Sequence, residues 1–343
     1  MRETHGETFD GAPGYLNSAT YGLASRRQAE VLRGRLRAWE LGEMTPRDFD
    51  VPVAAAREAF ASLAGVPTST VSMGGSVSAL IGLFAAVVPD GSRVVTLTGE
   101  FTSVSAPFHV HGGRGVTVTA LGPGELERRA GEFDVVAVSL VQSADGYVLD
   151  VPTLRASLAG RPTRVVLDVT QAMGWMRLDV GWADAVVGGS YKWLVSPRGA
   201  AWMAVRPDVA DSLVPLAASW YASERPWANT YELPPLLAGD GRRFDTSPAW
   251  FTLVGAGVAM PWLASLDMDA VQQHCTRLAG RVREALDLPA SPSAIVALDA
   301  DGAEQRLQAA GLRAAVRAGR VRVGFHLYND DEDVDRLLAA LAG

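Results

Sequence analysis

The sequence contains one lysine, Lys192, against thirty arginines. A guanidinium does not lose its proton in a protein, whereas a lysine amine can become neutral and attack an aldehyde carbon. The single lysine therefore marks a position where a deprotonatable amine is required, or it is an ordinary surface lysine left by chance in an arginine-rich chain. The residues around it distinguish these interpretations.

An acidic residue, Asp168, ends the apolar stretch 164–167, and Gln171 follows three residues later. A buried carboxylate needs a cationic partner, and the pyridinium nitrogen of pyridoxal phosphate is one. Gln171 would contact the phenolic oxygen of the same ring. The alternative is that Asp168 caps the following turn. Together with Lys192 as a Schiff-base lysine, these residues predict pyridoxal phosphate as the cofactor.

Two segments have the composition of a phosphate site. Gly75, Ser76 and Val77 follow a predicted strand and open a predicted helix, whose N-terminal amides favour an anion. Ser190 and Tyr191 precede the lysine and carry hydroxyl groups suited to phosphate. A plain turn with a serine cap is the alternative for the first segment.

Further candidates follow two other predicted strands. Phe101 comes after the strand at 93–97 and would stack on the pyridine ring, unless it is an ordinary core residue. Gln142 and Ser143 end the stretch 134–141 and would contact the phenolic oxygen or the substrate.

The elements that position these residues alternate as in a parallel α/β sheet. Ligands of such sheets bind at the carboxyl ends of the strands. We expect a large domain at 15–238 after an N-terminal arm at 1–14, and a smaller α/β domain at 239–343. Predicted strands are 70–73, 93–97, 116–120, 134–141, 164–169, 185–188 and 200–205, and predicted helices include 51–63, 76–88, 151–158 and 268–286. The last third adds strands at 295–298 and 321–326 and a closing helix at 331–341.

Composition narrows the function classes. The 343 residues are 48% hydrophobic and carry a net charge of −7, without a long basic run, so we expect no nucleic-acid partner. We expect no membrane span, because no apolar run is long enough, and no secretory signal. Cys275 is the only cysteine, which excludes an internal disulfide and suits a cytoplasmic protein. We assign no metal ligands.

These motifs resemble the class V aminotransferase and cysteine desulfurase group of fold-type-I pyridoxal-phosphate enzymes. The resemblance runs from 15–22 to 322–329, nearly the whole chain, and is most specific at Asp168, Gln171 and 190–192. It implies a large domain with a mostly parallel seven-stranded sheet and a smaller C-terminal domain. It also implies a small-molecule amino acid as the substrate.

The resemblance implies roles for individual residues. Lys192 would be the aldimine lysine, Asp168 the partner of the ring nitrogen, Gln171 the partner of the phenolic oxygen and Phe101 the stacking residue. Arg322 would grip the substrate carboxylate, for which a solvated surface charge is the alternative.

The family's active sites form across a homodimer, so we expect one here. Segment 244–248 would then reach the phosphate of the partner subunit through Thr246. Asn17 and Tyr21 would lie on the substrate side.

The sequence departs from cysteine desulfurases at several positions. Phe101 and Tyr191 replace histidines, and Phe101 cannot transfer protons, so acid–base work falls on Lys192. A tyrosine before the lysine resembles kynureninase instead. Val77 replaces a threonine found in many relatives. No cysteine lies in 296–320, where desulfurases carry their nucleophile, so persulfide-forming activity is not expected.

Several functions remain open. One is a β-elimination that breaks a carbon–sulfur bond, because 192–199 resembles the lyases of the ergothioneine pathway. Another is transamination to a keto acid, with epimerisation and kynureninase-type cleavage as further alternatives. A relative that binds the cofactor without turnover, or a nucleotide-binding α/β protein, represents a different class. Trp220, Tyr221 and Trp227 either line a substrate pocket or pack at an interface.

Overall fold

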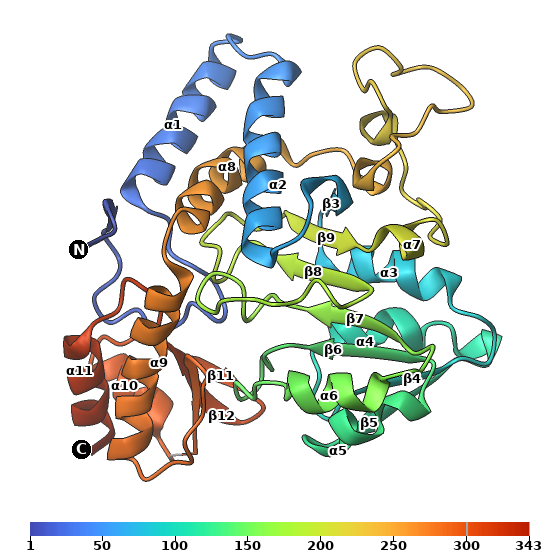
Figure 1. Cartoon of the computed structure of the whole chain (residues 1–343). Coiled ribbons are helices and arrows are strands. Elements are labelled where there is room, and N and C mark those ends of the chain that lie inside the picture. The colour runs from blue at the N-terminus through green and yellow to red at the C-terminus, as the bar shows by residue number, and fades with distance from the viewer. Residues whose placement is uncertain (300, 343) are drawn as a thin grey trace.

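A seven-stranded sheet forms the centre of the computed structural model, which describes residues 1–299 and 301–342 (Figure 1). The strand order is β3-β9-β8-β7-β6-β4-β5, and β9 runs in the opposite direction to the other six strands. This confirms the predicted α/β fold and each of its seven strands. The strands are β3 (Val71–Gly74), β4 (Arg93–Leu97), β5 (Thr117–Leu121), β6 (Val135–Ser139), β7 (Arg164–Asp168), β8 (Ala185–Gly189) and β9 (Ala201–Val205).

The central strands are buried on both faces, as their apolar sequences indicate. Along β6, Val136 and Val138 belong to one core, whereas Val135 and Ala137 belong to the other. The sheet is therefore the middle of three layers. The first core is covered by α2 (Asp50–Ala64), α5 (Glu125–Arg129), α6 (Val151–Leu158) and α8 (Trp250–Ala264). The second is covered by α3 (Val77–Val87), α4 (Thr102–His109) and α7 (Pro207–Ala210).

A smaller antiparallel sheet with the order β10-β12-β11 forms the C-terminal unit. Its own core joins the apolar faces of three helices to this sheet. A two-residue turn, Ala318 and Gly319, connects β11 to β12 with positive φ values of 49° and 77°. The elements are α9 (Met268–Ala285), β10 (Ile295–Leu298), α10 (Ala303–Ala309), β11 (Ala315–Arg317), β12 (Arg320–Gly324) and α11 (Asp331–Ala342).

The N-terminal residues pack against both units. After the hairpin of β1 (Arg2–Thr4) and β2 (Glu7–Phe9), Leu16 pairs with the small sheet: its N–H donates to Arg313 O and its carbonyl accepts from Gly324 N, both at 2.8 Å. The chain then enters α1 (Arg26–Glu40). Residues 15–21 are thereby held beside β12.

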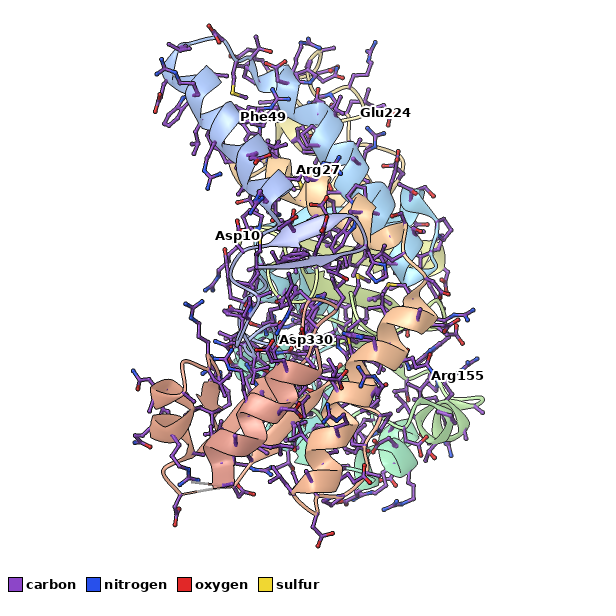
Figure 2. All side chains as sticks on the ribbon, turned by 90° about the vertical axis from the view of Figure 1, so that its left-hand side faces the viewer. Asp10, Arg27, Phe49, Arg155, Glu224 and Asp330 are labelled. Carbon is purple, nitrogen blue, oxygen red and sulfur yellow. The ribbon has the colours of Figure 1, made fainter. Side chains whose placement is uncertain are left out.

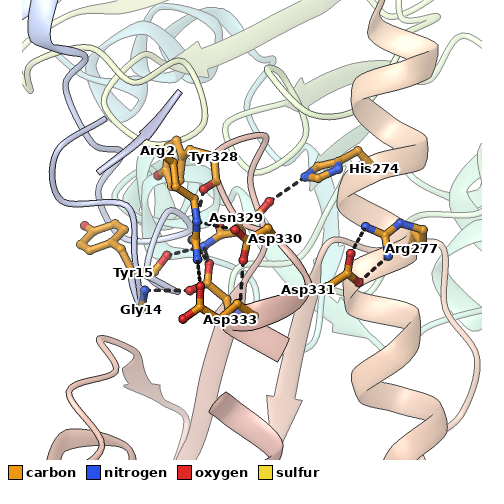
Figure 3. Close-up of polar contacts among 11 residues, drawn as sticks. Arg2, Gly14, Tyr15, His274, Arg277, Tyr328, Asn329, Asp330, Asp331 and Asp333 are labelled. Atoms are coloured by element: carbon orange, nitrogen blue, oxygen red, sulfur yellow. Dashed lines mark hydrogen bonds and ion pairs between the residues drawn. The ribbon is translucent and has the colours of Figure 1, made fainter. Parts of the chain in front are cut away.

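A buried polar network fixes this arrangement (Figure 3). Asp333 on α11 is buried, forms an ion pair with Arg2 and accepts the Gly14 N–H at 2.7 Å. Asn329 donates to Tyr15 O at 2.9 Å and to Asp333 at 2.8 Å. Loss of Arg2 would leave the buried carboxylate of Asp333 without its ion pair, so these contacts tie the N-terminal segment to the small unit.

Figure 2 shows charged side chains such as Arg155 and Glu224 projecting from the periphery. Among the described residues, no single helix is long and apolar enough to cross a membrane. Only α8 and α9 together pass that test, and they meet at 93°. α8 packs on α2 and contributes to the core of the large sheet, whereas α9 contributes mainly to the small unit. The domain boundary at 238/239 stays a prediction.

Candidate active site

Lys192 follows β8 at the carboxyl edge of the sheet and is buried. Its Nζ lies 5.1 Å from the centre of the Phe101 ring and 5.7 Å from that of Tyr191. Burial, with a smaller contribution from nearby arginines, lowers the pKa of Lys192 to about 8 against the opposing charge of Asp168. A substantial fraction of the amine is therefore uncharged near neutral pH, as a nucleophile requires.

Asp168 is the last residue of β7, the strand next to β8. Burial raises the pKa of its carboxyl group, while hydrogen bonds from Thr170 and the charge of Lys192 oppose the shift. Thr170 N donates to Oδ1 at 2.7 Å, and no arginine of the described residues forms an ion pair with this carboxylate. The carboxylate is thus available to a cationic group in the adjoining cavity.

A cavity of about 220 Å³ joins these residues. Nine residues that the sequence singled out line it: Gly75, Ser76, Val77, Phe101, Ser143, Asp168, Gln171, Tyr191 and Lys192. The remaining lining residues are Ser78, Thr102, Ser103, Ser139, Thr170, Gly189, Arg198, Gly199, Ala200 and Ala201.

The N-terminus of α3 forms one wall of the cavity. Ser76 is its N-cap, with an extended backbone, and accepts a hydrogen bond from Ala79 N at 3.3 Å. The backbone N–H groups of residues 75–78 have no acceptor among the described residues. A Cβ added at Gly75 would meet no atom within 4 Å, so the fold itself does not require glycine there. These amides suit an anionic group such as a phosphate.

Gln171 is held by four partners. Its Oε1 accepts from Trp193 Nε1 at 2.7 Å, and its Nε2 donates to Ala19 O at 2.9 Å and to Ser143 Oγ at 3.0 Å. Its backbone carbonyl accepts from Trp175 Nε1. Trp193 thus fixes the amide orientation, which sequence reasoning did not anticipate.

Arg322 on β12 is 1% exposed and reaches the same network. Nη1 donates to the carbonyl and hydroxyl oxygens of Ser143, and Nη2 donates to Thr20 Oγ1 at 2.7 Å. Its Nε is buried without an acceptor among the described residues, and no carboxylate pairs with the guanidinium. A buried cation without a counter-charge favours an anionic ligand.

Several predicted site residues do not line the cavity, and Arg322 is one of them: it reaches the cavity wall only through Ser143. Ser190 is fully buried and donates to Ala200 O at 2.8 Å, so its hydroxyl does not face the site as expected. Gln142 donates to Thr98 O at 3.1 Å. Asn17 bridges to Gly324, and the exposed Tyr21 lies 6.0 Å, ring to ring, from Tyr191. Thr246 donates its N–H to Met73 O at 3.1 Å beside β3.

The aromatic cluster of Trp220, Tyr221 and Trp227 also lies outside the cavity. Trp220 and Trp227 lie 4.8 Å apart by ring centres, and Trp227 Nε1 donates to Asp50 at the start of α2 at 2.7 Å. Within this chain the cluster packs against the start of α2, and its role in substrate binding or at an interface stays a prediction.

Sequence reasoning missed Glu100, which immediately precedes Phe101. Its carboxylate accepts from Ser139 N at 2.8 Å, Ser139 Oγ at 2.6 Å and Phe101 N at 2.8 Å. Burial raises its pKa to about 7 against these hydrogen bonds. Glu100 joins the ends of β4 and β6 and orients the backbone of Phe101. The available signal was a carboxylate just beyond an apolar strand, as for Asp168.

Known proteins resemble this chain in sequence. The chain is 26% identical over 310 residues to YcbU of Bacillus subtilis (strain 168), an uncharacterized aminotransferase; this spans 84% of the chain and 82% of YcbU. It is 25% identical over 324 residues to a probable hercynylcysteine sulfoxide lyase of Mycobacterium tuberculosis, spanning 84% and 78% of the two chains.

Solved structures agree in fold. The Escherichia coli cysteine desulfurase CsdA superimposes with a TM-score of 0.82 at 17% identity, over 98% of this chain and 96% of CsdA. C-DES, solved as a mutant with glycine covalently linked to its pyridoxal-phosphate cofactor, gives 0.83 at 17% identity over 96% of both chains. Residues 53–306, which include Asp168, Lys192 and the strands that position them, match the class V aminotransferase family. The chain therefore belongs to the class V aminotransferase family.

Proposed function

We propose that this protein is a pyridoxal-phosphate enzyme that acts on an amino acid and breaks a carbon–sulfur bond by β-elimination. The observation that carries the cofactor assignment is the buried Lys192 amine, which shares one cavity with the Asp168 carboxylate and the N-terminus of α3. The family and its structural neighbours use this cofactor. The residues present therefore fit the group.

Each part of the cofactor has a matching residue. The amides of residues 75–78 would bind the phosphate, and Phe101 would cover one face of the ring. Asp168 would hold a proton on the ring nitrogen. Ser143 would serve the phenolic oxygen, because its Oγ already accepts two hydrogen bonds and its own hydrogen remains to be donated. Gln171, predicted for this contact, already donates its amide hydrogens to Ala19 O and Ser143 Oγ, so it would hold Ser143 in place.

When bound, the cofactor withdraws electrons from the substrate's α-carbon. The chain supplies the remaining functions. Arg322, without a carboxylate partner, would orient the α-carboxylate of the amino acid. Lys192 Nζ, with a pKa of about 8, would remove the α-proton. Phe101 carries no ionisable group, so proton transfer rests on Lys192.

The buried position of Cys275 supports a lyase reaction that needs no protein thiol. Cys275 is fully buried in α9, and burial raises the pKa of its thiol. A buried, protonated thiol cannot act as the nucleophile of a persulfide-forming desulfurase. The resemblance to a probable hercynylcysteine sulfoxide lyase agrees with β-elimination at sulfur.

Transamination is the second candidate function, favoured by the resemblance to YcbU over most of the chain. It would use the same first proton transfer at Lys192. The two reactions differ in products: elimination, with uptake of one water, releases the sulfur leaving group, ammonia and a keto acid from one substrate, whereas transamination requires a second keto acid as the amino acceptor.

The test begins with the visible absorption spectrum of the purified protein, followed by borohydride reduction and peptide mass mapping. We expect the cofactor to become fixed to the peptide that contains Lys192. Lys192→Ala and Lys192→Arg should both abolish turnover, although arginine keeps the positive charge, because neither provides a free amine. A colourless protein that takes up no pyridoxal phosphate, or full activity in Lys192→Arg, would refute the proposal. Assays for ammonia release with and without added keto acids then separate the two reactions.

A further inference from the structure

One face of the small sheet carries three arginines, and two of them have no carboxylate partner among the described residues. In the β11–β12 hairpin, Arg317 is opposite Arg320 and Ala315 is opposite Arg322. Cross-strand partners and residues two apart share a face of a sheet, so Arg317, Arg320 and Arg322 leave the same face. Arg320 pairs with Asp299 at 2.7 Å. No carboxylate of the described residues forms an ion pair with Arg317 or Arg322.

These two arginines converge on one neutral group. Thr20 Oγ1 accepts from Arg322 Nη2 at 2.7 Å and from Arg317 Nη2 at 3.5 Å. Burial, with a smaller contribution from the charge of Arg317, lowers the pKa of Arg322 to about 10. Both guanidinium groups also lower the pKa of Lys192. Two cations placed together without an anion repel each other, and an anionic ligand between or beside them would be stabilised.

The two arginines differ in burial, with Arg322 in the interior and Arg317 at the surface. Arg322 is buried and contacts Ser143 in the cavity wall, whereas Arg317 is exposed at the end of β11. The turn at Ala318 and Gly319, with positive φ at both residues, holds Arg317 on a tight hairpin rather than on a long loop. If the α-carboxylate of the substrate binds at Arg322, the guanidinium of Arg317 is still without an anionic partner.

We propose that Arg317 binds a second carboxylate on the amino-acid substrate, distal to the α-carboxylate that Arg322 orients. The substrate is then a dicarboxylic amino acid or a conjugate that ends in a carboxylate. This inference rests on the proposed function, because it takes Arg322 as the α-carboxylate site. A charge-assisted contact of this kind contributes about tenfold or more in affinity.

The test compares ligands that differ only in the distal charge. L-Aspartate and L-asparagine form one pair, and L-glutamate and L-glutamine form the other. Binding to the cofactor-loaded enzyme is followed by the change in its visible spectrum and by calorimetry. We expect the acid of at least one pair to bind about tenfold more tightly than its amide. Arg317→Gln should remove this preference and leave amide binding unchanged, and Arg317→Lys should keep part of it.

Arg128→Gln is the matched control, because Arg128 is an exposed arginine on α5 that forms no ion pair with the described residues. It should keep the full preference. Equal binding of acid and amide in both pairs would overturn the inference. So would an equal loss for acid and amide in Arg317→Gln, since Arg317 would then serve the α-carboxylate. A protein that takes up no pyridoxal phosphate would overturn the proposed function itself, and this inference with it.

Discussion

The lone lysine allows a direct test of the electrostatics at the site. If the pKa of Lys192 is about 8, about one molecule in ten carries the free amine at pH 7. At the ordinary value of 10.5, the fraction would be about one in three thousand. Burial therefore raises the concentration of reactive amine by about 300-fold. The rate at which apoprotein takes up pyridoxal phosphate should rise with pH and level off above about pH 8.

The assay mixes apoprotein with excess pyridoxal phosphate at a series of pH values and follows visible absorption. Borohydride quenching and peptide mapping confirm that the product is on Lys192, the only lysine of the sequence. Asp168→Asn provides the control: the charge of Asp168 raises the pKa of Lys192, so its removal should move the midpoint to lower pH. A wild-type midpoint near 10.5, or a midpoint that moves upward in Asp168→Asn, would refute the reasoning.

Three further predictions concern residues away from the chemistry. Arg57→Ala should cost about 3–5 kcal/mol of unfolding free energy in urea titrations, because it leaves the carboxylate of Asp245 buried without its ion pair; an effect below about 1 kcal/mol would contradict this. His326 is buried with a pKa lowered to about 4, so the unfolded state binds more protons between about pH 6.5 and 4, and stability should fall by about 3 kcal/mol over that range. His326→Gln should remove that part of the pH dependence. Cys275→Ser should keep turnover close to wild type, and loss of activity without loss of stability would reopen the desulfurase interpretation.

The residues predicted most securely lie at the ends of single strands. Asp168 and Lys192 follow apolar stretches whose limits are visible in the sequence, and the parallel topology then brings β7 and β8 together. Local pattern was sufficient there because each side chain needs only its own strand to place it. Ser190 shows the limit of this reasoning. It lies two residues from Lys192, yet the turn after β8 directs its hydroxyl to Ala200 O.

Contacts between distant segments were not accessible in the same way. Arg322 meets Ser143 and Thr20 across separations of 179 and 302 residues, and no local pattern encodes such distances. α1 was missed because its sequence is mostly polar and only Gln28 is buried in it. α8 was missed for the opposite reason: it is apolar on nearly all sides, so it lacks the periodicity of an amphipathic helix.

The groups around the cavity differ in which of them can exchange a proton near neutral pH. Tyr191 has a raised pKa, Phe101 has no proton to give, and Cys275 is buried elsewhere in α9. Glu100 titrates at about 7, but three hydrogen bonds hold its carboxylate against Ser139 and Phe101 N. Of these four side chains and Lys192, all among the described residues, only Lys192 combines a pKa near neutral with a position on the cavity wall. A reaction that needs a single base at the α-carbon suits this site better than one that needs a second acid on the opposite face, and this favours elimination over epimerisation.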